Sequence, residues 1–161
     1  MKSLQFAPLA AVICSLCLVS PAAAIDKDKL EEALAEPVTM SFDQMSLEES
    51  LNVLVKRVAA IHDGFAIKII YNDLQFEGLT RNQSIRNYEA KDKPAAEVLT
   101  ELMQRGNSNR DVTDPRDPKQ KLIWIVGANP DDADKLAILV TTRAAAKKRG
   151  DKLPKVFQLK E

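Results

Sequence analysis

Cysteine and histidine are almost absent from this chain of 161 residues. Its two cysteines, Cys14 and Cys17, both fall in the apolar N-terminal stretch, and His62 is the single histidine. If that stretch is removed as a targeting signal, the remaining chain forms no disulfide and offers no nucleophilic thiol. Thiol catalysis is then excluded, and stability in an oxidising compartment must come from packing alone.

The chain also lacks a net charge and a long apolar run. Its 23 Lys and Arg residues balance its 23 Asp and Glu residues. This balance argues against a general binder of polyanions, so we expect no nucleic-acid partner. The apolar stretch 9–19 is shorter than the roughly 20 residues that a membrane-spanning helix requires. We therefore expect no integral membrane span after signal cleavage.

The first 24 residues have the order of a secretory signal peptide. Lys2 precedes the apolar stretch, and alanines at 22–24 supply the small residues that signal peptidase requires. We expect cleavage after Ala24, so that the mature protein begins at Ile25. The predicted location is therefore periplasmic or secreted.

Two periodicities predict the elements of the mature chain. Apolar and polar residues alternate in half-buried strands, whereas apolar residues recur every three or four positions in helices. These patterns predict strands at 38–42, 65–71, 83–88, 122–126 and 137–140, and helices at 46–60, 94–105 and 142–149. Ser46 and Glu49 have the spacing of a capping box at a helix start. The last two strands are expected to form an antiparallel hairpin across a connection at 127–136.

The order strand-helix-strand-strand-helix-strand-strand, followed by a basic helix, predicts an α+β fold. We expect a two-layer sandwich of helices on a sheet, with a core that includes Leu51, Leu54, Leu99 and Trp124. A polar loop is expected at 106–120. The predicted divisions are a signal peptide at 1–24, a mobile lead-in helix and linker at 25–36, the α+β domain at 37–149 and a polar tail at 150–161.

Residues 38–42 followed by 45–51, and residues 93–99 leading to 122–126, carry a resemblance to a known family. Over about 37–141 the chain resembles the short N-terminal (STN) domain of secretins and TonB-dependent receptors, found in exported bacterial envelope proteins. The resemblance implies a periplasmic interaction module that contacts a partner protein or further copies of itself. We expect neither pore formation nor signal relay, because the sequence shows no receptor barrel or secretin pore segment.

No arrangement typical of an enzyme is visible in the sequence. His62 lies where a helix should end, and we interpret it as a residue that helps to cap carbonyls. Glu48 and Glu49 are adjacent on a helix, so they do not face each other as paired acids. No local signature combines a nucleophile with a base. We therefore predict a protein that is not an enzyme and needs no cofactor.

Two acidic loops raise the question of calcium. Residues 131–134 form one loop, and Asp111, Asp114 and Asp117 lie in the other. Both offer hard oxygen ligands, but neither has the ligand spacing of an EF-hand. Asp and Asn also favour turns without any metal, so we predict no metal site and leave calcium binding open.

The leading hypothesis is a non-enzymatic protein-interaction module. The strand at 83–88 is poorly suited to the centre of a sheet, so we expect a partner segment or a second copy to pair near it. The expected binding residues are those of this strand and of the basic helix: Ile85, Arg86, Tyr88, Arg143, Lys147, Lys148 and Arg149. The basic residues equally suit a solvated helix C-terminus.

Two alternatives come from other functional classes. The first is a periplasmic binder of a small or polymeric anionic ligand, with the loops 106–120 and 127–136 as its walls. The second is an enzyme that acts on the envelope. A pocket lined by convergent polar groups would favour a ligand binder, whereas an open sheet edge would favour the interaction module.

Overall fold

The protein was analysed as a computed structural model that describes residues 26–159. The expected signal peptide, Cys14 and Cys17 lie outside these residues. The elements in chain order are α1 (Lys27–Ala35), β1 (Pro37–Ser46), α2 (Leu47–Ala59), β2 (Ile67–Ile69), α3 (Tyr71–Phe76), β3 (Ser84–Pro94), α4 (Ala95–Arg105), β4 (Leu122–Asn129), β5 (Asp132–Thr142), α5 (Arg143–Arg149) and the 3-10 turn η1 (Lys155–Phe157). In residues 26–159, none of the helices is long and apolar enough to span a bilayer.

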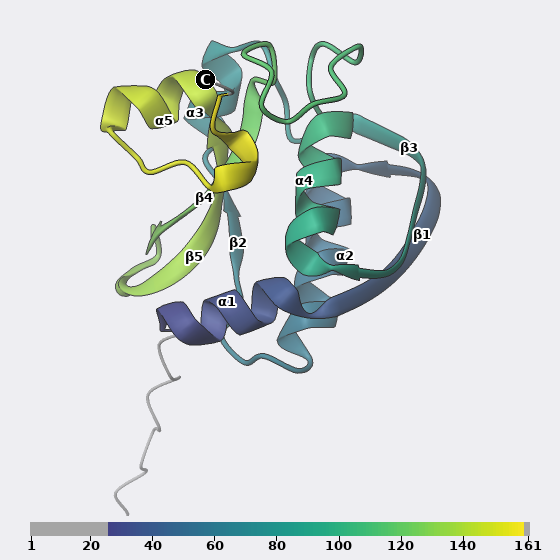
Figure 1. The fold of residues 1–161 in the computed structure, drawn as a ribbon, viewed down its shortest axis with the longest axis vertical. Helices are drawn as coiled ribbons and strands as arrows, with labels where there is room; N and C mark the ends of the chain where they lie inside the picture. The colour runs from purple at the N-terminus through teal and green to yellow at the C-terminus, as the bar shows by residue number, and fades with distance from the viewer. Residues whose placement is uncertain (1–25, 160–161) are drawn as a thin grey trace, which may run out of the picture.

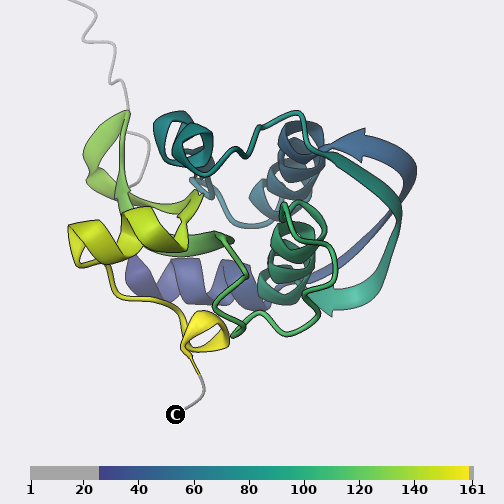
Figure 2. The ribbon, with the colours of Figure 1, turned by 90° about the horizontal axis from the view of Figure 1, so that it is seen from above.

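The strands form two separate sheets, and a pair of helices lies between them (Figure 1). β1 and β3 pair antiparallel in a two-stranded ribbon. The other sheet has the order β2-β5-β4, in which β2 is parallel and β4 antiparallel to β5. Helices α2 and α4 pack side by side, with the ribbon beyond them on the side away from β4 and β5 (Figure 2). The predicted α+β class and order of elements are confirmed, with additional helical segments.

Short-range hydrogen bonds cap the starts of α2 and α5. The predicted capping box of α2 is present: Glu49 N donates to Ser46 Oγ at 3.2 Å, and Ser46 N donates to Glu49 Oε2 at 3.0 Å. Thr142 caps α5 through its hydroxyl, which accepts from Ala145 N at 3.3 Å. These caps satisfy backbone donors that have no partner inside the helix.

The core forms where the apolar helix stripes meet the sheets. Leu51, Leu54 and Leu99 are buried as predicted, and Trp124 is only 5% exposed. Trp124 Nε1 donates to Thr100 Oγ1 at 3.0 Å, so its polar atom is satisfied inside the core. The predicted core is therefore confirmed at all four positions.

Two segments differ from the local predictions. Residues 71–76 form the short helix α3, where a strand end and a polar connection were expected. Its helical turn buries Leu74, a single apolar residue that leaves almost no periodic signal. The β4–β5 hairpin extends to the Asn129–Asp132 pair, so the expected connection at 127–136 is mostly strand. Backbone pairing continues there although many of the side chains face solvent.

Both ends of the described chain pack onto the domain. Leu30 and Ala33 of α1 are buried, and α1 lies against α4, so this segment is more than the expected mobile lead-in. Phe157 is fully buried in the segment that was expected to be a polar tail. Its ring meets Trp124 edge-on, with ring centroids 6.0 Å apart.

Candidate binding groove

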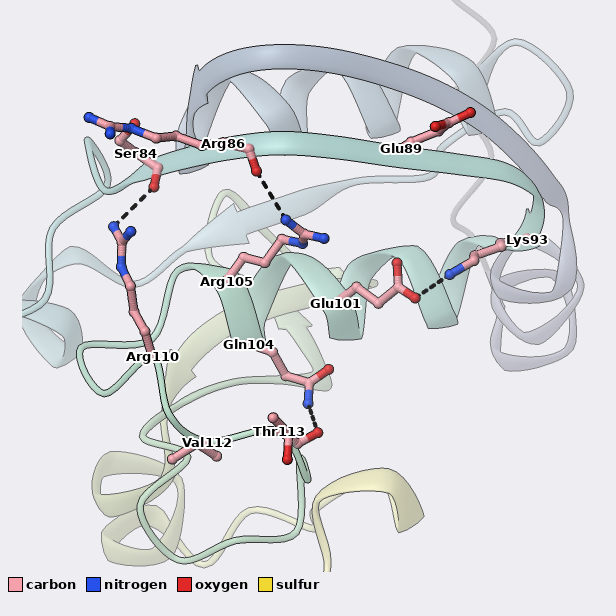
Figure 3. Close-up of a pocket in the computed structure, with 10 residues that line it drawn as sticks. All are labelled: Ser84, Arg86, Glu89, Lys93, Glu101, Gln104, Arg105, Arg110, Val112 and Thr113. Carbon is pink, nitrogen blue, oxygen red and sulfur yellow. Dashed lines mark hydrogen bonds and ion pairs between the residues drawn. The ribbon is translucent and has the colours of Figure 1, made fainter.

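The outer edge of β3 is open, because β3 has β1 as its only neighbour in the ribbon. A groove of about 530 Å³ runs beside this edge, with α4 and the loop at 106–120 as its other walls (Figure 3). We call it the β3 groove. Its lining residues are Ser84, Arg86, Glu89, Lys93, Glu101, Gln104, Arg105, Arg110, Val112 and Thr113.

Side-chain hydrogen bonds hold the loop that forms one wall. Asn107, which is fully buried, donates from Nδ2 to Asn109 O at 3.0 Å and to Lys119 O at 3.1 Å. Gln104 of α4 donates from Nε2 to Thr113 O at 2.7 Å. These bonds replace the backbone ladder that a loop lacks. They place Arg110 opposite the strand edge.

Two arginines contact the outer edge of β3. Arg105 Nη1 donates to the carbonyl oxygens of Arg86, at 3.0 Å, and of Asn87, at 3.3 Å. Arg110 Nη2 donates to Ser84 O at 3.4 Å. Figure 3 shows the two side chains reaching the strand from α4 and from the loop. Carbonyl acceptors on this edge are thus already engaged, and the edge is rich in hydrogen-bond donors.

At the opposite end of the groove, acidic side chains surround Lys93. Lys93 forms ion pairs with Glu101 and, at 3.4 Å, with Glu97. Tyr88 donates its hydroxyl to Glu101 Oε2 at 2.8 Å. The hydrogen bond to Glu101 raises the pKa of Lys93, and burial together with Glu101 raises the pKa of Tyr88. Glu101 is therefore committed to structural partners.

Positive charge is uncompensated at the arginine end. Arg86, Arg105 and Arg110 form no ion pair with any carboxylate of residues 26–159, and all three are exposed. Glu89 also lacks an ion pair in this part of the chain, and it lies toward the Lys93 end (Figure 3). The arginine end consequently favours an anionic group.

The binding residues predicted on β3 differ in their exposure to solvent. Arg86 is exposed and lines the groove. Ile85 and Tyr88 are buried, and Tyr88 packs 5.4 Å from the Phe42 ring, so neither side chain is available to a partner. Asn87 has a φ of 47°, which breaks strand alternation and lets residues 85 and 88 both face inward. This break explains the weak strand signal.

The predicted basic helix does not reach the groove. Arg143 donates to the carbonyls of Phe157, Pro115 and Gln120 at 2.6, 3.0 and 3.1 Å, and burial lowers its pKa.

Arg149 pairs with Asp73 and Asp151 at 2.6 and 2.8 Å. Burial opposes its charge, but these carboxylates raise the pKa of Arg149 overall. Both arginines hold the fold together.

Lys147 and Lys148 are the members of this basic set that remain exposed without an ion pair in residues 26–159. Apart from Arg86, the sequence analysis named none of the lining residues of the groove as binding residues: Ser84, Glu89, Lys93, Glu101, Gln104, Arg105, Arg110, Val112 and Thr113. Arg105 and Arg110 carried no distinguishing signal, since a basic residue in a last helical turn or a polar loop is ordinary. Only the packing of α4 against β3 brings them together.

A second groove of about 500 Å³ shares Glu101 and Gln104 with the first. Trp124 and Thr100 line it, but their polar atoms bond to each other rather than converging on the space between the walls. No lining residue comes from 127–136, so that segment does not form the wall that a ligand binder was expected to have.

His62 has a different contact from the one expected. Its Nε2 lies 3.0 Å from Glu36 Oε2 and joins the end of α2 to the junction of α1 and β1. Within residues 26–159, no three His, Cys, Asp or Glu side chains gather as a metal site.

Comparisons with protein families, with curated proteins and with solved structures found no match.

Proposed function

We propose that this protein is a non-enzymatic protein-interaction module of the bacterial envelope that binds an extended segment of a partner along β3. The observation that carries the proposal is the open outer edge of β3, which runs beside a groove of about 530 Å³. Exposed strand edges commonly accept another chain, because their backbone groups lack neighbours. The resemblance to STN domains supports the same class of function.

The chemistry of the edge favours an acceptor-rich partner. Arg105 and Arg110 already occupy carbonyl oxygens at Ser84, Arg86 and Asn87. The remaining backbone N–H groups and the guanidinium groups are all donors. A partner segment that supplies carbonyl and carboxylate oxygens would complement this edge.

The groove residues also support a binding role over a catalytic one. Ser84 is the only hydroxyl-bearing lining residue on β3, and its buried Oγ has no hydrogen-bond partner in the described part of the chain. A serine nucleophile needs a base within hydrogen-bond reach. Glu101, the acid beside the strand, is engaged by Lys93 and Tyr88. The proposed location, periplasmic or secreted, rests on the signal-like residues 1–24.

A binder of a small or polymeric anionic ligand is the second candidate. The observation that favours it is the uncompensated charge of Arg86, Arg105 and Arg110. The loop at 106–120 contributes one wall of the groove, as that hypothesis requires. The long open edge beside these arginines suits a peptide better than a compact anion.

The test is site-specific photo-crosslinking in intact cells. A photoreactive side chain at Glu89, which is exposed in the groove, should crosslink to a partner or to a second copy, whereas one at Lys147 should not. Arg86→Pro should reduce the crosslinked product more than Arg86→Ala, because only proline also removes the N–H donor. Circular dichroism would establish that each variant is folded.

Neutralising Lys147 and Lys148 serves as the charge control. It should change only the salt dependence of partner recovery, because these lysines lie outside the groove. Equal crosslinking with Arg86→Pro and the unaltered protein would show that the outer edge of β3 is not the binding surface. The proposal would then fail.

A further inference from the structure

Arg105 and Arg110 are held at a defined spacing on the edge of β3. Arg105 binds the carbonyls of Arg86 and Asn87, at 3.0 and 3.3 Å, and Arg110 binds the carbonyl of Ser84, at 3.4 Å. Strand residues two positions apart direct their carbonyls to the same edge, and a strand rises about 3.3 Å per residue. The carbonyl oxygens of Ser84 and Arg86 are therefore about 6.6 Å apart along the strand. The positive Asn87 φ angle lies beyond this interval.

Both guanidinium groups keep donors for another ligand. An arginine carries five N–H donors, and the strand carbonyls are bound through Nη1 of Arg105 and Nη2 of Arg110. The carbonyls are neutral, so neither positive charge is cancelled. Arg105 also lies over the Tyr88 ring, with its Cζ 5.2 Å from the ring centroid. These contacts restrict the side chains before any partner arrives, which lowers the entropic cost of binding.

We propose that Arg105 and Arg110 read two carboxylate side chains, two residues apart, in an extended partner segment. This inference rests on the proposed function and names the partner's chemistry. Side chains two residues apart lie on the same face of an extended chain and repeat at about 6.6 Å. This repeat equals the spacing of the Ser84 and Arg86 carbonyls. Planar guanidinium forks bind carboxylates in two-pronged geometry.

The rest of the groove orients such a segment. Arg86 of β3 adds a third positive charge at the Ser84 end of the groove (Figure 3). Glu89 and Glu101 lie toward the other end, where Lys93 is already paired with Glu101 (Figure 3). Like charges repel, so the acidic pair of the partner would lie at the Ser84 end of the groove. The sequence pattern recognised is acidic-x-acidic.

The test compares capped synthetic peptides of equal length on the protein lacking residues 1–24. One peptide has two glutamates separated by one threonine, its isomer has them adjacent, and a third replaces both with glutamine. Fluorescence anisotropy should show the spaced peptide binding at least tenfold more tightly than the isomer, since adjacent residues point to opposite faces. The glutamine peptide should bind most weakly.

Variants test whether Arg105 and Arg110 bind the two carboxylates. Arg105→Gln and Arg110→Gln should each abolish the preference for the spaced peptide, and Arg105→Lys should reduce it, because lysine lacks the planar fork. Lys147→Gln, which changes an exposed lysine outside the groove, should leave the preference intact. If a variant fails to fold, the peptide isomers on the unaltered protein still decide the proposal.

Three results would overturn the inference. These are equal affinities for the spaced and adjacent isomers, retention of the preference in both glutamine variants, and inorganic polyphosphate binding at least as tightly as the spaced peptide. Persistent crosslinking from Glu89 in cells, together with any of these results, would leave the proposed function standing. The Arg86→Pro crosslinking experiment tests only whether the outer edge of β3 binds a partner. Its result does not depend on the spacing of acidic residues in that partner.

Discussion

Several arginine side chains join separate segments of this chain through backbone carbonyl oxygens. Arg143 binds carbonyls in the loop at 106–120 and in η1, whereas Arg105 and Arg110 bind carbonyls on β3. A guanidinium group can satisfy several carbonyls at once because its five donors point in different directions. The difference between these arginines lies in burial. Arg143 is partly buried among its carbonyls, whereas Arg105 and Arg110 remain exposed beside an open groove.

Truncating a core leucine tests the packing of α2. Leu51 is 2% exposed, so Leu51→Ala should lower the free energy of unfolding by about 2 to 5 kcal/mol through lost burial and a residual cavity. Urea unfolding followed by circular dichroism would measure the loss.

Lys147→Ala is the matched surface change. Lys147 is exposed and lacks an ion pair in the described part of the chain, so its truncation should alter stability by less than about 0.5 kcal/mol. Equal unfolding midpoints for Leu51→Ala and Lys147→Ala would show that the faces of the helices are assigned wrongly.

At the scale of elements, β3 combines a buried face with an accessible edge. Its side chains at Ile85 and Tyr88 pack inward, and its outer edge meets the arginines of α4 and the loop. Charged groups at a strand edge discourage uncontrolled pairing with other chains. The same arrangement leaves room for a partner that satisfies the arginines, which is why edge protection and selective binding are compatible here.

The start of α2 should make stability depend on pH. Hydrogen bonds from the Ser46 side chain and backbone lower the pKa of Glu49, so the folded state favours the carboxylate. A carboxyl group with a lowered folded pKa stabilises the protein above its unfolded pKa of about 4.3, and this contribution is lost as the pH falls through the folded value. Glu49→Gln should therefore remove part of the stability difference between pH 7 and pH 3.

Urea unfolding across that pH range would measure this effect. Ser46→Ala should cost about 1 kcal/mol at pH 7, because it removes the acceptor for Glu49 N. It should also weaken the pH dependence. An identical loss of stability on acidification in the unaltered protein and in Glu49→Gln would contradict the assigned role of the capping box.

At the scale of the whole molecule, α2 and α4 form a layer between the β1–β3 ribbon and the three-stranded sheet (Figure 2). Each helix contacts strands of both sheets. The β3 groove lies on the ribbon side, while the basic helix α5 follows β5 of the other sheet. This separation explains why the two sets of binding residues expected from the sequence do not form one surface.

Export of the whole protein is the remaining prediction. Residues 1–24 have the features of a signal peptide, so the mature chain should begin at Ile25 outside the cytoplasmic membrane. Mass spectrometry of the protein from fractionated cells would identify the N-terminus and its compartment. A cytoplasmic protein that retains residues 1–24 would refute both the signal peptide and the proposed envelope location.

The regular elements were largely determined by local sequence. The apolar stripe of α2 and the Ser46–Glu49 capping box act within a few residues, so their pattern predicts the helix and its start. The hairpin of β4 and β5 followed from two apolar runs close in sequence. Such signals are reliable when one short segment contains both the pattern and its physical cause.

Tertiary structure alone decided the candidate site. Arg105 and Arg110 acquire their role only when α4 and the loop meet β3, and those segments are about 20 or more residues apart from their contacts on the strand. Long-range contacts also buried Phe157 and gave Arg143 and Arg149, which were expected to bind a partner, hydrogen bonds and ion pairs within the fold. Sequence periodicity reports which face of an element is buried, but not which neighbour will cover it.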